Sequence, residues 1–276
     1  MSTKKSSESI NLIDLNQARI FLVNEVIPAA SALLRNYFST ASFTSRRKEG
    51  VDFTTQADEE TDNLLVERIR KRLPQSEFLT EETAPLDYTG FDSKENLWVI
   101  DPLDGTTNFS RKNPNFAISI ALVNKGVTRL AVIHRPITNE TFTAQIDKRG
   151  AFLNEKTIKV SETVDLRSVV MACDWAWDLE KRKVIVNLLA KLTPKVRQIK
   201  TMGSAASDLA SLANGNIDVY VHSGLKPWDA AAASLIVTKA GGKITTLSGE
   251  KWNVFIPEML VTNGLLHEQI EKLIIG

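Results

Sequence analysis

The sequence is poor in cysteine and histidine. Its 276 residues include one cysteine, Cys173, and three histidines, His134, His222 and His267. With one cysteine the chain cannot form an intrachain disulfide, and no second cysteine indicates a thiolate metal site. We therefore expect a reducing, cytoplasmic location. Neither a paired histidine nor a known local signature accompanies Cys173, which disfavours cysteine catalysis.

The sequence also lacks long apolar runs and an excess of charge of one sign. No stretch of about 18 apolar residues occurs, so we expect no transmembrane helix. Residues 1–10 are polar, lack the apolar core of a signal peptide and are predicted to be a disordered tail. The formal net charge of +1 favours neither nucleic acid nor an anionic membrane surface as a partner.

What the sequence does have is enough apolar residues for a sizeable core, at 43% of the chain. Apolar residues at helical spacing predict a long helix over residues 11–38, kinked or broken near Pro28. The same spacing predicts a second helix over residues 59–73, with Asp58 as its N-cap.

Strand-like segments follow in the middle of the chain. Those at 116–123, 129–134 and 140–144 predict an antiparallel meander, and strands alternate with helices after residue 165. We therefore predict one unit over residues 11–276, with an N-terminal α+β half (11–165) and a C-terminal α/β half (166–276).

A basic stretch separates the first two predicted helices. Residues 39–50 are polar and contain Arg46, Arg47 and Lys48 in a row. A solvated loop is the commoner structure for such a stretch. A mobile cationic loop that closes over an anionic substrate is the alternative, and both remain open at this point.

The most informative stretch runs from Leu97 to Asn108. Its first four residues are apolar and predict a short buried strand, and Asp101 to Asn108 is a cluster of turn and cap residues. Asp101 and Asp104 follow the strand, at the place where α/β layouts bind ligands. Taken alone, the pattern also fits an ordinary acidic turn with a capping aspartate.

Other acids lie at the ends of apolar elements. Glu81 and Glu82 follow a short predicted strand, and Asp229 precedes an alanine-rich helix. If these acids meet Asp101 and Asp104, they form the all-oxygen site that Mg²⁺ or Mn²⁺ prefers, and not a zinc or copper site. Two carboxylates about 4 Å apart repel by roughly 4 kcal/mol at an effective dielectric near 20. The acids therefore either stay apart in solvent or bind a metal.

Four of these segments together resemble the inositol monophosphatase family, a superfamily that also includes fructose-1,6-bisphosphatase. The stretch from Trp98 to Phe109 looks like the first signature of the family, and Trp228 to Gly242 looks like the second. Two further segments resemble its glutamate-bearing element and its Asp-x-x-Thr-x-x-Asp segment; they are 78–83 and 52–58. The resemblance implies an α+β fold, a layered α-β-α-β-α sandwich, and homodimerisation.

The resemblance also implies the metal ligands. Glu81, Asp101 and the backbone carbonyl of Leu103 would hold one Mg²⁺. Asp101, Asp104 and Asp229 would hold a second, so that Asp101 bridges the two ions. A third, weaker ion would touch Glu81 largely through water, which gives two to three ions in all; Mn²⁺ is the alternative metal.

The remaining roles come from the same resemblance. Asp58 and Thr106 would polarise the attacking water and, with Glu81, are the expected catalytic residues. The backbone amides of Gly105 and Thr106 would bind the phosphate oxygens, which suits the N-terminus of a helix. The substrate's polyol or sugar would face a short loop and one further position; these residues are Gly203, Ser204, Ala205 and His222.

The implied activity is Mg²⁺-dependent hydrolysis of a small phosphate monoester, first of all inositol monophosphate, with lithium sensitivity. His222 stands where inositol-specific members carry a glutamate, so it either contacts substrate or is simply a loop residue. Histidinol phosphate, fructose 1,6-bisphosphate and nucleotide 3′-phosphates are therefore alternative substrates. A regulatory or scaffold protein that retains the metal site is the non-enzyme alternative.

Overall fold

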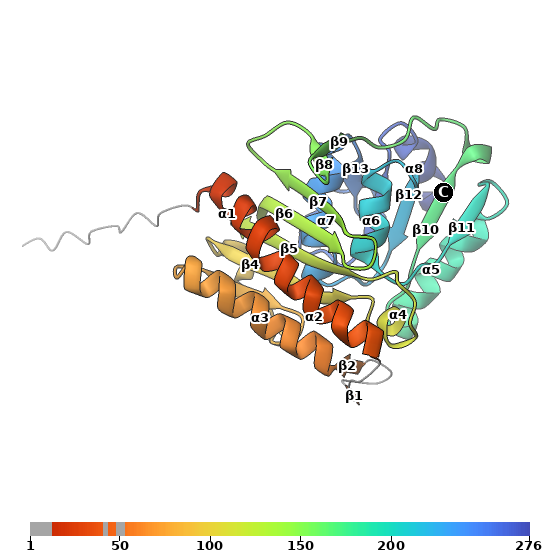
Figure 1. Cartoon of the computed structure of the whole chain (residues 1–276). Coiled ribbons are helices and arrows are strands. Elements are labelled where there is room, and N and C mark those ends of the chain that lie inside the picture. The colour runs from red at the N-terminus through yellow and green to blue at the C-terminus, as the bar shows by residue number, and fades with distance from the viewer. Residues whose placement is uncertain (1–12, 41–43, 48–52) are drawn as a thin grey trace, which may run out of the picture.

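Two β-sheets, with helices between and outside them, make up the fold of this computed structural model, which describes residues 13–40, 44–47 and 53–276 (Figure 1). The first sheet has seven strands in sequence order: β3 (Glu77–Thr80), β4 (Leu97–Asp104), β5 (Ala117–Asn124), β6 (Val127–Arg135), β7 (Glu140–Gln145), β8 (Ala151–Leu153) and β9 (Lys156–Ile158). β3 is parallel to β4, and each later pair is antiparallel, which confirms the predicted meander.

The second sheet has five strands in the order β11-β10-β12-β14-β13. They are β10 (Val170–Cys173), β11 (Gln198–Lys200), β12 (Val219–His222), β13 (Lys243–Thr245) and β14 (Met259–Thr262). β10 is parallel to β11 and β12, whereas β14 is antiparallel to β12 and β13. A small separate ribbon pairs β1 (Ser45–Arg47) with β2 (Phe53–Thr55).

One face of the first sheet is covered by the N-terminal helices. These are α1 (Leu15–Phe21), a π-helical turn (Leu22–Val26), α2 (Ile27–Thr40) and α3 (Gln56–Arg72). Successive side chains of a strand point to opposite faces of the sheet, so every second residue of each strand faces these helices. Trp98, Ile100 and Ile120 are among those that pack with the helices in one buried cluster.

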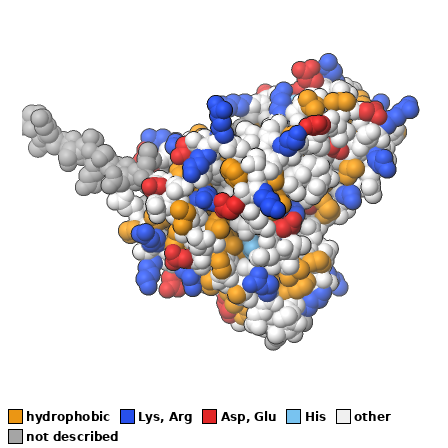
Figure 2. Space-filling model, turned by 45° about the horizontal axis from the view of Figure 1, so that its top comes forward, with side chains coloured by type: hydrophobic (Ala, Val, Ile, Leu, Met, Phe, Trp, Pro, Cys, Tyr) orange, Lys and Arg blue, Asp and Glu red, His pale blue; other side chains and the backbone are white. Residues whose placement is uncertain are grey.

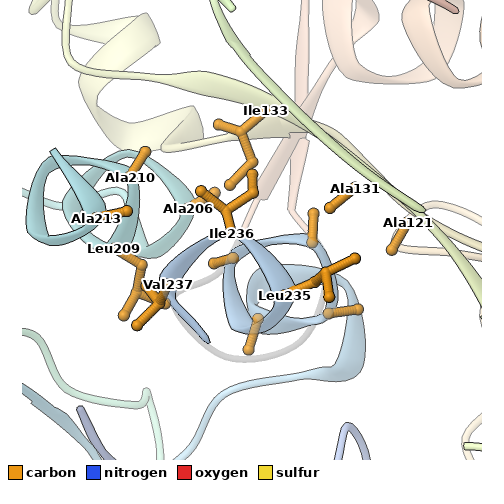
Figure 3. Close-up of a cluster of buried hydrophobic side chains, with 14 of the residues drawn as sticks. Ala121, Ala131, Ile133, Ala206, Leu209, Ala210, Ala213, Leu235, Ile236 and Val237 are labelled. Carbon is orange, nitrogen blue, oxygen red and sulfur yellow. The ribbon is translucent and has the colours of Figure 1, made fainter. Parts of the chain in front are cut away.

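The opposite face of the first sheet packs on two buried helices, α6 (Ala205–Ala213) and α7 (Pro227–Lys239). Figure 3 shows Ala121, Ala131 and Ile133 of the sheet facing these helices. Alanines on both sides allow the helices and the sheet to approach closely. The same cluster contains buried residues of the second sheet, so α6 and α7 form a layer between the sheets.

The outer face of the second sheet is covered by α5 (Leu179–Leu192) and α8 (His267–Ile275). Met171, Val219 and Leu260 pack with these helices in a third cluster. The layers therefore follow one another as helix, sheet, helix, sheet, helix. This confirms the predicted layered α+β fold.

The long N-terminal helix departs from its prediction in two ways. It begins at Leu15, where the side chain of Asp14 accepts the N–H groups of Asn16 and Gln17. It is also not broken at Pro28, since a π-helical turn over Leu22–Val26 precedes the proline and α2 runs through it to Thr40. The predicted tail over residues 1–10 lies outside the described residues.

Two further local predictions are wrong. Asp58 is not the N-cap of α3; Thr55 is, and Asp58 completes a capping box from the third helical position. The basic stretch is not loop throughout, since α2 extends to Thr40 and Ser45–Arg47 form β1. Residues 41–43 and 48–52 lie outside the described part of the chain.

The surface carries charges of both signs. On the face drawn in Figure 2, lysine and arginine side chains alternate with aspartate and glutamate side chains and do not gather in one patch. Within the described residues, no helix has the length and apolar character needed to cross a bilayer.

Candidate active site

The Asp101–Asp104 segment ends β4 with a bulge. Asp101 pairs with Ser119 and Asp104 with Ala117, so three steps on β4 face two on β5. Pro102 has no N–H to donate to the ladder, and bulges redirect the side chains that follow them. Asp101 is 1% exposed, and its Oδ1 accepts the N–H of Leu103 at 3.0 Å.

Glu81 reaches the same place from the neighbouring strand. β3 pairs in parallel with β4 so that Thr80 lies opposite Ile100, and the N–H of Glu81 donates to the Ile100 carbonyl at 3.1 Å. The next residue along each strand is therefore an acid, Glu81 beside Asp101. The parallel register explains why a pair so far apart in sequence meets at one sheet edge.

Asp104 joins the first sheet to α6. Its Oδ2 accepts the hydroxyl of Ser204 at 2.6 Å and the N–H of Ala206 at 2.7 Å. Ser204 is also the N-cap of α6, where it accepts the N–H of Ser207. The predicted substrate loop at Gly203 to Ala205 is thus held against the acidic motif. Burial raises the pKa of Asp104 to about 6 despite these hydrogen bonds, which lower it.

Asp229 comes from the start of α7. Pro227 occupies the first turn, and the Asp229 carboxylate accepts the N–H of Lys226 at 2.7 Å. Burial raises its pKa well above the usual range, and Asp104 and Glu81 raise it further. Asp101 shows the same effect, first from burial and then from Glu81, Asp104 and Asp229. The four predicted acidic ligands therefore lie within electrostatic reach of one another.

Asp58 and Thr106 lie together, as a shared role requires. The hydroxyl of Thr106 is 2.9 Å from Asp58 Oδ1 and 3.2 Å from the Leu103 carbonyl. Asp58 is fully buried and also accepts the N–H and the hydroxyl of Thr55. Burial raises its pKa to about 7, with Glu81 and Glu82 adding to the shift and Thr55 opposing it.

Gly105 allows the tight turn between β4 and α4 (Thr106–Ser110). Its φ of +100° is the left-handed conformation that glycine adopts without strain. A Cβ there would lie 3.1 Å from the Asn115 carbonyl and 3.2 Å from the Gly203 carbonyl. Glycine at this position therefore serves both the turn and the close approach of the substrate loop.

His222 does not lie in a loop. It ends β12, is buried, and its Nδ1 accepts the N–H of Gly224 at 2.9 Å. Burial lowers its pKa to about 4, with a smaller contribution from Lys181. At neutral pH His222 is therefore an uncharged ring that shapes the turn before α7.

Sequence reasoning missed several polar residues that support this site. Asn115 and Ser207 bind each other and adjoin the substrate loop, and Asp208 is buried beside them, which raises its pKa well above the usual range. One signal was present for Asp208, a lone acid within the apolar helix Ala205–Ala213. Asn115 carries no such signal, because its side chain bonds Met202 and Ser207, which lie about 90 positions away.

The donor set fits a hard divalent cation. Glu81, Asp101, Asp104 and Asp229 offer only oxygen, the ligand that Mg²⁺ prefers. Within the described part of the chain, no three acidic, histidine or cysteine side chains already surround a single point closely enough to hold a metal. The fit therefore rests on the chemistry of the donors and on their mutual repulsion.

The sequence profile of the inositol monophosphatase family matches residues 14–275. The chain belongs to this family. Its relatives include a fructose-1,6-bisphosphatase/inositol-1-monophosphatase of Thermotoga maritima, 35% identical over 81% of this chain and 82% of the relative. The Nus factor SuhB of Escherichia coli is 37% identical over 80% of this chain and 82% of that protein.

The fold is that of the family as well. A solved inositol monophosphatase (IMPase) of Thermotoga maritima superposes with a TM-score of 0.82 at 32% identity, covering 94% of this chain and 97% of that one. The resemblance read from the sequence motifs is thereby confirmed. Membership of the inositol monophosphatase family makes this chain a phosphatase and does not by itself identify the substrate.

Proposed function

We propose that this family member hydrolyses small phosphate monoesters in a Mg²⁺-dependent reaction, with inositol monophosphate as the first candidate substrate. The observation that carries the proposal is that four carboxylates, from the end of β3, from β4 and from α7, lie within electrostatic reach of one another. Burial of such a group without a cation opposes folding. Their position at the carboxyl end of β4, beside a glycine turn, suits a phosphate substrate.

The metal would be held by the chain's own oxygens. Glu81, Asp101 and the Leu103 carbonyl form one set, and Asp101, Asp104 and Asp229 form another that shares Asp101. When bound, divalent ions neutralise phosphate charge and lower the pKa of bound water. Two or three Mg²⁺ ions, or Mn²⁺ in their place, match the acidic groups that the site provides.

The protein's groups would orient the reactants. The Thr106 hydroxyl oxygen lies 2.9 Å from Asp58 Oδ1. Together the two side chains can accept and position the protons of an attacking water. The amides of Gly105 and Thr106 can donate to phosphate oxygens, and Gly203, Ser204 and Ala205 can line the side that faces the alcohol. His222, with Nδ1 engaged by Gly224, can offer its other ring nitrogen to that side.

A second role is favoured by one relative. The Escherichia coli protein at 37% identity is named a Nus factor. A regulatory role, alone or besides hydrolysis, is therefore the second candidate function, and it bears on our expectation that nucleic acid is no partner. We also propose that the protein forms a homodimer, as the family resemblance implies.

Phosphate release with and without Mg²⁺ tests the proposal. The purified chain is assayed on inositol 1-phosphate, fructose 1,6-bisphosphate, histidinol phosphate and a nucleotide 3′-phosphate, each with Mg²⁺ or with EDTA. We expect release from at least one ester that stops with EDTA and returns when Mg²⁺ is added in excess. Equal rates in both conditions would refute the metal-dependent reaction, and no release from any ester would favour the regulatory role.

A further inference from the structure

Tyr88 connects two segments that each carry a proposed metal ligand. The first segment is the loop after β3, which begins with Glu81, and the second is the start of α7, which carries Asp229. The Tyr88 hydroxyl accepts a hydrogen bond from the Lys226 ammonium at 3.3 Å. The Tyr88 ring also meets the Trp228 ring edge-on, with 6.1 Å between the ring centres. Two segments about 140 positions apart in the sequence are thus in direct contact.

Both partners of Tyr88 lie next to Asp229 in the chain. Lys226 is the N-cap of α7, and its backbone N–H donates to Asp229 Oδ2 at 2.7 Å. Trp228 directly precedes Asp229, is buried, and packs in the core cluster between the two sheets. A shift of Lys226 or Trp228 therefore moves the Asp229 carboxylate.

The other end of the connection is the loop that Glu81 begins. Glu81 is fixed to β4 by its backbone N–H. The chain then runs outward, since Leu86 is 96% exposed, and it returns at Tyr88, which is half-buried and packs against the same core cluster. Tyr88 also borders an open cavity of about 1200 Å³. Solvent space therefore lies on one side of the loop, and its contacts with Lys226 and Trp228 support it from the other.

The ring and the hydroxyl of Tyr88 make separate contributions. The ring packs on Trp228, and an edge-on aromatic pair is favourable beyond the area that it buries. The hydroxyl oxygen supplies an acceptor for a charged donor, the Lys226 ammonium, and such hydrogen bonds are stronger than neutral ones. Phenylalanine at this position would keep the ring contact and lose the hydrogen bond, so the two contributions can be measured separately.

We infer that Tyr88 is a positioning residue for the metal site: through Lys226 and Trp228 it holds the start of α7, and with it Asp229, against the loop that carries Glu81. The inference rests on the proposed function, because Glu81 and Asp229 are its proposed metal ligands. Ligands from separate segments bind a cation more tightly when their spacing is fixed beforehand, since less order is then imposed on binding. Tyr88 therefore raises the affinity for Mg²⁺ without touching the ion.

Calorimetric titration with Mg²⁺, in the absence of substrate, tests the inference on the wild type, Tyr88→Phe and Tyr88→Ala. We expect the Kd for Mg²⁺ to rise about tenfold in Tyr88→Ala, the lower end of the range for groups behind a metal ligand. It should rise by a smaller factor in Tyr88→Phe, which keeps the ring contact. The Mg²⁺ concentration for half-maximal phosphate release should rise by the same factors, and kcat at saturating Mg²⁺ should change less than the Kd.

Leu153→Ala is the matched control for lost packing. Leu153 of β8 packs against the same core cluster as Tyr88, near the opposite edge of the first sheet from β3. The substitution should lower the melting temperature of the metal-free chain, because apolar contacts are lost, and leave the Kd for Mg²⁺ unchanged. A rise of the Kd in Leu153→Ala equal to that in Tyr88→Ala would mean a general effect of packing and would overturn the inference.

Tyr88→Phe decides the question if Tyr88→Ala does not fold, because it preserves the ring. Equal Kd values in Tyr88→Phe and a wild type that binds Mg²⁺ would overturn the inference alone and leave the proposed function standing. A wild type that binds no Mg²⁺ would end the proposed function, and this inference with it.

Discussion

Asp101, in its proposed role as a metal ligand, would serve binding at the expense of the fold. It is 1% exposed, and burial together with Glu81, Asp104 and Asp229 raises its pKa. A carboxylate in this position destabilises the metal-free chain, since charge is removed from water and placed near other acids. A divalent cation would reverse that effect.

Replacing Asp101 by asparagine separates the two effects. We expect Asp101→Asn to lower Mg²⁺-dependent phosphate release by more than about a hundredfold, because even the loss of a group behind a metal ligand costs about 10–100-fold. We also expect the metal-free melting temperature to stay equal or rise, since a buried charge is removed. Turnover and thermal unfolding, each with Mg²⁺ and with EDTA, are the measurements.

Asp147→Asn is the matched control for this variant. Asp147 is an exposed acid between β7 and β8, so the substitution changes charge equally without touching the site. It should leave both turnover and the Mg²⁺-induced rise in melting temperature unchanged. Near wild-type turnover in Asp101→Asn would remove Asp101 from the proposed ligands.

At the level of elements, the substrate loop is supported by residues from three other places in the fold. These are the segment just before β5, the end of β6 and the helix α6. Asn115, just before β5, binds the Met202 carbonyl at 2.8 Å and accepts the hydroxyl of Ser207 in α6 at 2.9 Å. Arg135, at the end of β6, donates to the same Ser207 hydroxyl at 2.9 Å. The loop is therefore held by the first sheet and not by its own sequence.

Asn115→Ala should loosen the loop and weaken substrate binding. Each lost buried hydrogen bond costs about 1 kcal/mol, so one or two of them correspond to roughly a 5–30-fold change. We expect this change in KM, with a smaller effect on kcat, because the acidic motif is untouched. Steady-state kinetics on the ester that is hydrolysed best measure both constants.

Asn216→Ala serves as the control for Asn115→Ala. Asn216 is exposed beyond the end of α6 and lies outside the site. Its KM and kcat should equal those of the wild type. An equal fall of kcat in Asn115→Ala with KM unchanged would mean that Asn115 acts on the reacting groups and not on the loop.

The elements that were predictable are those with a strong local pattern. Strands β4 to β6 carry apolar runs, and β7 alternates polar and apolar residues. The antiparallel order of β5, β6 and β7 follows from the short turns between them. β13 was missed, because Lys243–Thr245 is short and has one apolar residue. The N-cap of α3 was misplaced, since Thr55 and Asp58 are both good caps and only the structure shows which of them precedes the helix.

Across the whole molecule, the sequence motifs identified the acids but not the contacts that join them. Glu81, Asp101 and Asp229 come from segments separated by up to about 150 residues, and their meeting depends on strand register and on the position of α7. The family resemblance supplied that long-range information. The contacts of Asn115 depend on this chain's own packing, which no motif described.

His134 and His267 connect different elements of the fold, and all three histidines should affect its stability in acid. His134 lies between Ser31 of α2 and Thr141 of β7, and His267 bonds Thr245 and Thr262 of the second sheet. Burial lowers the pKa of all three, His222 included, to about 4. Each is therefore neutral in the folded chain under conditions where an unfolded histidine is already protonated.

The sign of the resulting pH dependence follows from proton counts. Between pH 6.5 and 4 the unfolded chain binds more protons at these histidines, so their contribution to the free energy of unfolding is complete above about pH 6.5 and is lost as the pH falls towards 4. Asp58 and Asp104 act in the opposite direction, because their pKa values are raised to about 7 and about 6. In the wild type, the change of the free energy of unfolding with pH is therefore the difference between these two opposing effects. Substituting one histidine isolates its contribution.

His134→Gln isolates that contribution, because glutamine can still bond Ser31 and Thr141 while carrying no titratable group. Urea unfolding at pH 7, 6, 5 and 4.5 gives the free energy of unfolding for both proteins. Their difference should change with pH by up to about 1.4 kcal/mol per pH unit below pH 6, the effect of one proton. The variant should lose stability less steeply in acid, whatever its stability at pH 7. Parallel curves for the two proteins would mean that His134 titrates in the folded chain as it does in the unfolded one.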